Sequence, residues 1–194
     1  KYDGHNFTTF TTDDGLAHNE TYSLFQDSRG ELWMGTEGGV SVYNGSSIVS
    51  LKESDGVSET AVTCFEEGPD NTIYIGHFGT GVTVASNNGF SALTQADGLA
   101  SNYVNCIEQD YQGRLWMGTG NGLSFYHTNA FQPLPFGENL AGENVMSLLE
   151  DRKHNVWAGT ARNGTYYYDG SKSTQFTEAQ GLSANAVFSL LEDN

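Results

Sequence analysis

Histidines, carboxylates and one glycine-rich segment are the parts of this sequence best suited to chemistry, but their spacing argues against most catalytic devices. The five histidines show no metal-ligand spacing such as H-E-x-x-H. No nucleophile elbow or triad pattern is present. The segment "GTGNG" at Gly118–Gly122 leads into an expected strand rather than a helix, so no helix N-terminus awaits a phosphate. We therefore expect that this chain is not an enzyme and holds no metal or cofactor.

Aspartates recur after apolar runs, at Asp27, Asp110, Asp151 and Asp193. A calcium array is not expected, because no Asp-x-Asp-x-Asp-Gly run exists. Asp commonly caps turns, so we predict that these side chains do so. Glu150 precedes Asp151 directly, and neighbours in a strand point to opposite faces, so the two do not form a catalytic carboxylate pair.

An internal repeat positions these residues. The pentapeptide "LWMGT" occurs at Leu32–Thr36 and again at Leu115–Thr119. The aromatic residue of this motif recurs in steps of 41, 42 and 41 residues, and the glycine two positions later keeps the same steps. A turn of the D-G-L type and an apolar run ending in E-D keep the same register, which makes coincidence untenable. The aromatic residues of the four copies are Trp33, Tyr74, Trp116 and Trp157.

Each period contains four short expected strands joined by Gly- and Asp-rich turns. A four-stranded unit every 40–45 residues is the signature of a β-propeller blade, and no 3.6-residue helical period competes with it. The sequence thus predicts an all-β propeller segment over residues 1–194, with a repeat of 41–42 residues. About four complete blades and a partial one at each end would form an arc of a larger propeller. The expected repeats cover approximately 5–45, 46–87, 88–129 and 130–170, with a partial repeat at 171–194.

Composition excludes several partners. The net charge is −16 with only 8 Lys and Arg, so basic patches for nucleic acid are missing and contact with anionic membranes is not expected. No stretch approaches the ~18 apolar residues of a transmembrane helix. The N-terminus "KYDGHNFTTF" is polar, unlike a signal peptide, and lacks a starting Met, so we expect the chain to be processed or part of something longer.

Cysteine and tryptophan positions predict packing rather than chemistry. Cys64 and Cys106 occupy one repeat position that other copies fill with Ser. Packed sheets lie ~10 Å apart, whereas a disulfide needs Cα atoms within ~7 Å, so two buried free thiols are expected. The recurring Trp residues are expected to pack between blades rather than to form a sugar platform.

The stretch "VNCIEQDYQGRLWMGTGNGLSFY" (104–126) resembles the two-component regulator propeller repeat nearly throughout. The second copy departs most, at Gly68, Tyr74 and His77, and the fourth has Asn139 where others have Gly. The resemblance implies the periplasmic or extracytoplasmic part of a membrane-anchored two-component or hybrid histidine-kinase sensor. It also implies a carbohydrate or other small polar ligand, further blades and signalling modules in the same polypeptide, and a homodimer of the full-length protein.

Ligand contacts are expected at the channel mouth, where two kinds of loop meet: those entering each first strand and those following each second strand. Asn recurs at one position of the first kind of loop, where capping of the loop is the alternative role. Arg162 could meet a carboxylate. The candidate ligand-binding residues are His18, Asn19, His77, Phe78, Asn102, Tyr103, Asn121, Glu143, Asn144, Arg162 and Asn185.

Two other functions remain open, because propellers host many activities. A protein-binding scaffold would show a broad exposed aromatic patch. A propeller lyase or hydrolase would show histidines and carboxylates clustered around a metal at the channel mouth.

Overall fold

Four antiparallel sheets of four strands each make up the fold. The computed structural model describes residues 1–2, 4–134 and 140–193. Strands follow chain order within every sheet, so each sheet is a meander, and the predicted propeller blades are confirmed. The blades are β1 (Thr21–Gln26), β2 (Leu32–Thr36), β3 (Gly39–Tyr43) and β4 (Ile48–Leu51); β5 (Val62–Glu67), β6 (Ile73–His77), β7 (Val82–Ser86) and β8 (Gly89–Leu93); β9 (Val104–Gln109), β10 (Leu115–Thr119), β11 (Gly122–His127) and β12 (Ala130–Gln132); and β13 (Val145–Glu150), β14 (Val156–Thr160), β15 (Thr165–Tyr168) and β16 (Ser173–Phe176).

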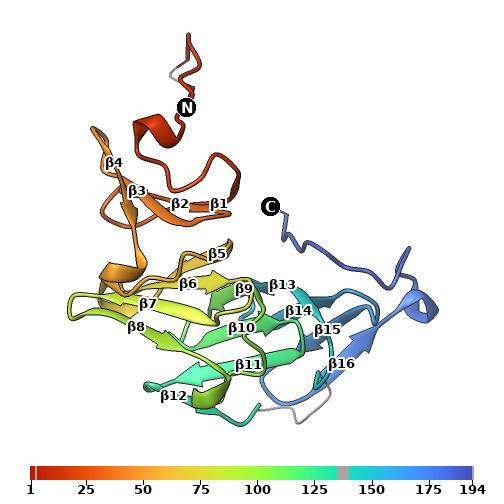
Figure 1. Ribbon diagram of the computed structural model, residues 1–194. Coiled ribbons are helices and arrows are strands. Elements are labelled where there is room, and N and C mark those ends of the chain that lie inside the picture. Colours follow the sequence, from red (N-terminus) through yellow and green to blue (C-terminus); the bar gives the residue numbers. More distant parts are fainter. Residues whose placement is uncertain (3, 135–139, 194) are drawn as a thin grey trace.

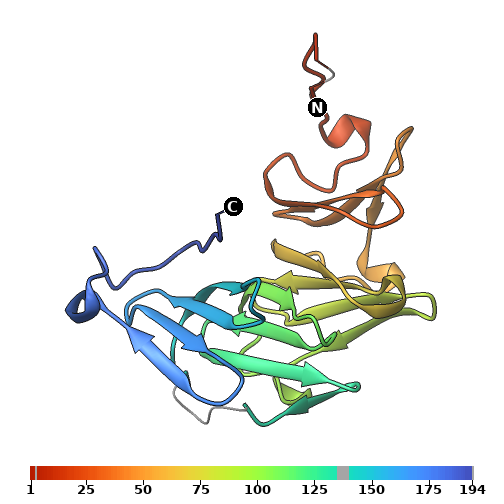
Figure 2. The same cartoon turned by 180° about the vertical axis from the view of Figure 1, so that it is seen from behind.

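The blades follow one another around an arc. The first strands β1, β5, β9 and β13 contact one another in that order. Figures 1 and 2 show these first strands along the concave side of the arc, with the later strands fanning outward. Short 3-10 turns interrupt the loops, and none of the helical turns in the described part of the chain is long and apolar enough to span a membrane. These turns are η1 (Thr12–Asp14), η2 (Glu53–Asp55), η3 (Pro69–Asn71), η4 (Gln95–Asp97) and η5 (Glu178–Gln180).

The hydrophobic core lies between blades. One cluster joins Trp33 of the first blade to Phe65 and Ile75 of the second. Another joins Trp116 of the third blade to Val156 and further residues of the fourth. Trp33 and Trp116 are 5% and 0% exposed, so the predicted role of these tryptophans in packing between blades is confirmed.

The repeated glycine of each second strand permits this close packing. A Cβ atom added at Gly118 would lie 2.5 Å from Cys106 Sγ and 2.8 Å from Val145 Cγ1 of the next blade. The inner-strand position opposite this glycine therefore accepts only a small residue. Cys64 and Cys106 fill it as free thiols, as predicted, although their burial is intermediate rather than complete. Burial raises the pKa of the Cys64 thiol to about 12.

Each Asp–Trp pair closes the first turn of its blade. Asp27 Oδ1 accepts the backbone N–H groups of Arg29 and Glu31, at 3.0 and 2.8 Å. Its Oδ2 accepts the indole N–H of Trp33 at 3.1 Å. Equivalent bonds join Asp110 to Trp116 and Asp151 to Trp157. The predicted turn capping is therefore confirmed for these three aspartates, and each also fixes an indole.

The second blade departs from this pattern at two positions together. Gly68 stands where the others have Asp, and Tyr74 stands where they have Trp. A Cβ added at Gly68 would lie 2.6 Å from Tyr74 Cε2, so the phenol occupies the space of the missing carboxylate. The two departures compensate for each other. The predicted departure at Asn139 lies outside the described residues.

Glutamates at the ends of two inner strands, β5 and β13, join neighbouring blades. Glu67 accepts the backbone N–H of Ser28 at 2.8 Å, and Glu150 accepts that of Tyr111 at 2.9 Å. The equivalent turn residue of the second blade is Pro69, which has no N–H to donate. The third blade accordingly has Gln109 rather than Glu at the facing position.

Replacing Asp110 with Ala should lower the free energy of unfolding by about 2–4 kcal/mol, because the variant loses the acceptor of two backbone N–H groups and of a buried indole N–H. Urea denaturation monitored by tryptophan fluorescence measures the change. Asp13→Ala, at an exposed acid on η1, is the control and should change stability little. Equal stability of the two variants would contradict the proposed role of the Asp–Trp pair.

Candidate functional site

A cavity of about 510 Å³ opens on the concave side of the arc. Its walls come from the four inner strands and from loops beside them. Glu37 and Phe78 come from two of the loops that follow second strands. Ala61 comes from a loop that enters a first strand. The lining residues are Tyr22, Glu37, Ala61, Thr63, Phe78, Asn105 and Met146.

A β-bulge in every inner strand creates the cavity wall. The pairing register between first and second strand shifts once in each blade, which leaves one extra residue on the inner strand. A bulge redirects the side chain of that extra residue. The four bulge residues are Tyr22, Thr63, Asn105 and Met146, and all four line the cavity.

Sequence analysis missed these four residues. They vary in type, whereas the repeat was recognised from the residues that stay the same. A usable signal was present, because each bulge residue directly precedes the small Ser or Cys that faces the repeated glycine.

Hydrogen bonds across blades hold the wall in place. Thr63 Oγ1 donates to the carbonyl of Val104 in the next blade at 2.7 Å. Asn105 Nδ2 donates to the carbonyl of Val145 and to Oδ1 of Asn144, both at 2.8 Å. The wall residues are therefore preorganised by the same contacts that join the blades.

A tyrosine and two glutamates form one rim. The Tyr22 hydroxyl donates to Glu37 Oε2 at 2.7 Å, and Glu20 Oε2 lies 3.4 Å from the same hydroxyl. The hydrogen bond to Glu37, together with burial and the charges of both carboxylates, raises the pKa of Tyr22 to about 12. Tyr22 therefore stays protonated at neutral pH.

Two exposed aromatic rings form another rim. Phe78 and Tyr103 are 59% and 51% exposed, and their rings meet edge to face with centroids 5.0 Å apart. Backbone bonds fix both loops, since Phe78 N–H donates to the carbonyl of Ala61 and Gly120 N–H to that of Tyr103. The structure thus brings together two of the predicted residues, Phe78, which lines the cavity, and Tyr103, which contacts Phe78.

The remaining predicted residues take different places. Asn144 touches the cavity wall through Asn105. Asn121 and Arg162 are exposed in the loops that follow second strands, and His18 Nδ1 accepts the backbone N–H of Glu20 at 3.1 Å.

The expectation that His77 contacts a ligand is wrong, because its ring is completely buried. His77 Nε2 lies 2.9 Å from Thr83 Oγ1 inside the second blade. Burial lowers the pKa of His77 from 6.5 to about 4, so the ring is neutral at physiological pH. Replacement of the repeated Thr by His therefore changes the interior of the blade rather than the channel.

The repeated asparagines cap turns. The side-chain oxygens of Asn19, Asn102 and Asn185 each accept the first backbone N–H of a 3-10 turn, at 2.9 Å. This is the alternative role considered for them, and it engages the oxygen of each carboxamide. Both carboxylate oxygens of Glu143 lie 2.7 Å from Asn163 Nδ2, which donates to them.

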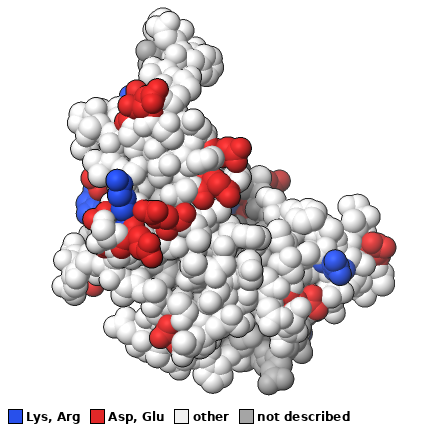
Figure 3. Space-filling model, in the orientation of Figure 1, with Lys and Arg blue, Asp and Glu red and all other residues white. Residues whose placement is uncertain are grey.

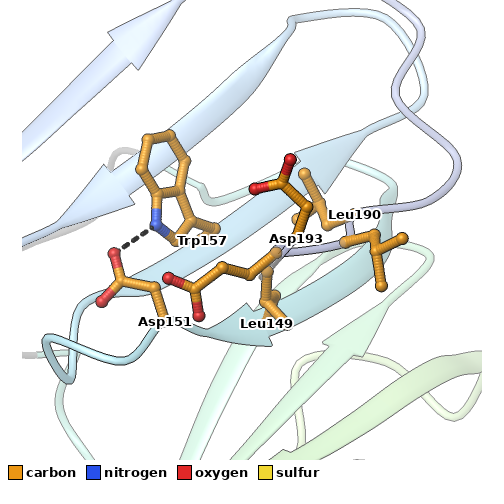
Figure 4. A pocket seen from close by; sticks show the side chains of 7 residues that line it. Leu149, Asp151, Trp157, Leu190 and Asp193 are labelled. Atoms are coloured by element: carbon orange, nitrogen blue, oxygen red, sulfur yellow. Dashed lines mark hydrogen bonds between the residues drawn. The ribbon is translucent and has the colours of Figure 1, made fainter.

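A second cavity of about 480 Å³ adjoins Trp157, on the face of the fourth blade that the C-terminal segment covers. Figure 4 shows Asp151 bonded to the indole, with Leu190 and Asp193 of the C-terminal segment beside it. Trp33 and Trp116 are buried by a full blade at the equivalent place, whereas only the C-terminal segment covers Trp157. Residues 182–193 form no strand, although Val187 N–H donates to the carbonyl of Thr160 at 2.8 Å. We therefore interpret this cavity as a partly covered blade interface rather than a ligand site.

Acidic side chains outnumber basic ones on the face shown in Figure 3. Within the described ranges, no group of three or more His, Cys, Asp or Glu is arranged to hold a metal ion.

A family model described as "Two component regulator propeller" matches residues 15–38, 98–121 and 139–162. The chain thus carries two-component regulator propeller repeats. The second blade is not matched, and it is the blade with the departures at Gly68, Tyr74 and His77. None of the curated proteins matches the sequence significantly.

Solved structures with similar blades share little sequence with this chain. The extracellular domain of a B. thetaiotaomicron protein described as a hybrid two-component system is 20% identical with a TM-score of 0.75, over 92% of this chain and 25% of that one. PorZ, a surface component of the type-IX secretion system of Porphyromonas gingivalis, is 18% identical with a TM-score of 0.74, over 96% and 32%. Virginiamycin B lyase from Staphylococcus aureus is 12% identical with a TM-score of 0.64, over 81% and 55%. Such similarity shows the fold alone, and this chain spans about a quarter to a third of the first two proteins.

The buried His77 predicts a pH dependence of stability. Between pH 6.5 and about 4 the unfolded chain binds a proton that the folded chain does not, so stability falls as the pH falls through this window. A His77→Thr variant, with the residue of the other three blades, should lose this part of the slope. The free energy of unfolding in urea at about pH 7 and about pH 5 tests the prediction. If the free energy of unfolding changes between these two pH values by the same amount in the variant as in the wild type, the prediction is wrong.

Proposed function

We propose that this chain is part of the ligand-sensing propeller of a two-component sensor, and that it binds a carbohydrate or another small polar molecule in the cavity on its concave side. The cavity is the observation that carries the proposal. Its volume of about 510 Å³ falls within the range of small-molecule sites, roughly 300–1,000 Å³. Its lining combines apolar and polar side chains, as ligand sites commonly do.

The repeats support the sensor part of the proposal. A similar arc occurs in the extracellular domain of the B. thetaiotaomicron protein, which supports the proposal that this chain also lies outside the cytoplasm. Further blades and the signalling modules would belong to the same polypeptide, and a homodimer would be its assembly. Binding rather than catalysis is the proposed role of the segment.

A second candidate role is the binding of an extended peptide. The exposed rings of Tyr22, Phe78 and Tyr103 favour it, because they offer apolar area at the two rims of the cavity. The volume of the cavity beside them, about 510 Å³, favours a small ligand more strongly.

Replacing Phe78 with Ala should weaken sugar binding about tenfold, because the variant loses an exposed aromatic face at the cavity. Calorimetric titration with glucose, galactose, xylose and their disaccharides measures the dissociation constants. Phe188→Ala is the matched control, since Phe188 is also exposed and does not line the cavity. Equal affinities of the two variants would contradict the assigned site. Absence of binding by every sugar would contradict a carbohydrate ligand.

A further inference from the structure

The hydrogen-bond donors that line the cavity are already used within the protein. The Tyr22 hydroxyl donates to Glu37, and the Thr63 hydroxyl lies within bonding distance of the carbonyls of Gly76 and Val104. Both donor positions of the Asn105 amide are taken by Asn144 and Val145. The side-chain groups left to meet a ligand are therefore acceptors: the carboxylate of Glu37, the amide oxygen of Asn105 and the hydroxyl oxygens.

Negative charge gathers at the same place. The backbone N–H of Glu37 donates to the carbonyl of Glu20 at 3.0 Å, which holds the two glutamates side by side. Both carboxylates face the Tyr22 hydroxyl, and in the described part of the chain neither forms an ion pair. Among the residues that the structure describes, no Lys or Arg lines the cavity. With a net charge of −16 the rest of the molecule adds to this field.

Aromatic rings complete the arrangement. Phe78 lines the cavity and its ring meets that of Tyr103 edge to face, and Tyr22 of the inner strand β1 lines the same cavity. A cation is attracted to the face of such rings as well as to a carboxylate. An ammonium group has three donors, no acceptor and a positive charge, which matches what this cavity offers.

We propose that the ligand of this cavity carries a protonated primary amine, as an amino sugar does, and that Glu37 is the residue that selects for it. The inference rests on the proposed function, because it names the class of ligand for the same site. The ammonium group would lie between the carboxylate of Glu37 and the rings at the rim, and the rest of the ligand would extend over Met146 and Asn105. Ligands with carboxylate or sulfate groups would be repelled.

Calorimetric titration of the whole chain at about pH 6, where a primary amine is protonated, tests the proposal. The matched probes are glucosamine, N-acetylglucosamine, glucose and glucuronate. We expect glucosamine to bind at least about tenfold more tightly than the other three. Glu37→Gln, which keeps the shape and removes the charge, should abolish this preference. Asp169→Asn is the control for charge alone, since Asp169 lies in the turn between the outer strands β15 and β16, and it should keep the preference.

Each outcome decides one of the two proposals. Equal binding of glucosamine and glucose, unchanged in Glu37→Gln, would overturn the amine inference and leave sugar binding intact. Tighter binding of glucuronate would overturn it as well. If no sugar binds, 1,4-diaminobutane separates the cases: binding that Glu37→Gln abolishes supports the amine site without a carbohydrate, and absence of binding overturns both proposals.

Discussion

The close approach of neighbouring blades at one glycine is the constraint on which this structure depends. In each blade the second strand lacks a side chain where the inner strand presents Ser or Cys and the next blade presents Val. Nothing larger fits at the contact between Gly118, Cys106 and Val145. The rows of apolar residues on either side can then interlock, and a core forms between sheets although no single blade encloses one.

Hydrogen bonds at the turns that follow the inner strands reinforce this packing. They also show how the chain tolerates departures from its repeat pattern. Gly68 and Tyr74 replace Asp and Trp together because the phenol fills the space of the carboxylate. Pro69 lacks an N–H group, and Gln109 replaces the glutamate that would have accepted it. Substitutions at these places are coupled in pairs, because each side chain has a partner in its own blade or in the one before.

Much of the fold could be predicted because its determinants repeat. The steps between the aromatic residues and glycines defined the blades, and Asp27, Asp110 and Asp151 were correctly assigned to capping. The recurring asparagines were proposed as ligand contacts, with the capping that the structure shows as the alternative. The site was harder to predict. Phe78 and Tyr103 were proposed as ligand contacts from loop position alone, and of the two Phe78 lines the cavity. The bulge residues Tyr22 and Met146 were not proposed, since a bulge depends on strand pairing and leaves no constant residue behind. His77 was misplaced because loop proximity in sequence does not show which way a ring turns.

The bulge has a consequence for how such a protein can change. The residues that hold the blades together and those that face the channel alternate along the same strand, and at Thr63 and Asn105 the channel-facing side chain also bonds to the next blade. A substitution at Met146, by contrast, alters what the channel offers while Gly159 and its neighbours Ser147 and Val187 keep their fit. The blades thus differ in how freely their channel-facing position can change its chemistry. Recognition can vary at such a position while the scaffold stays the same.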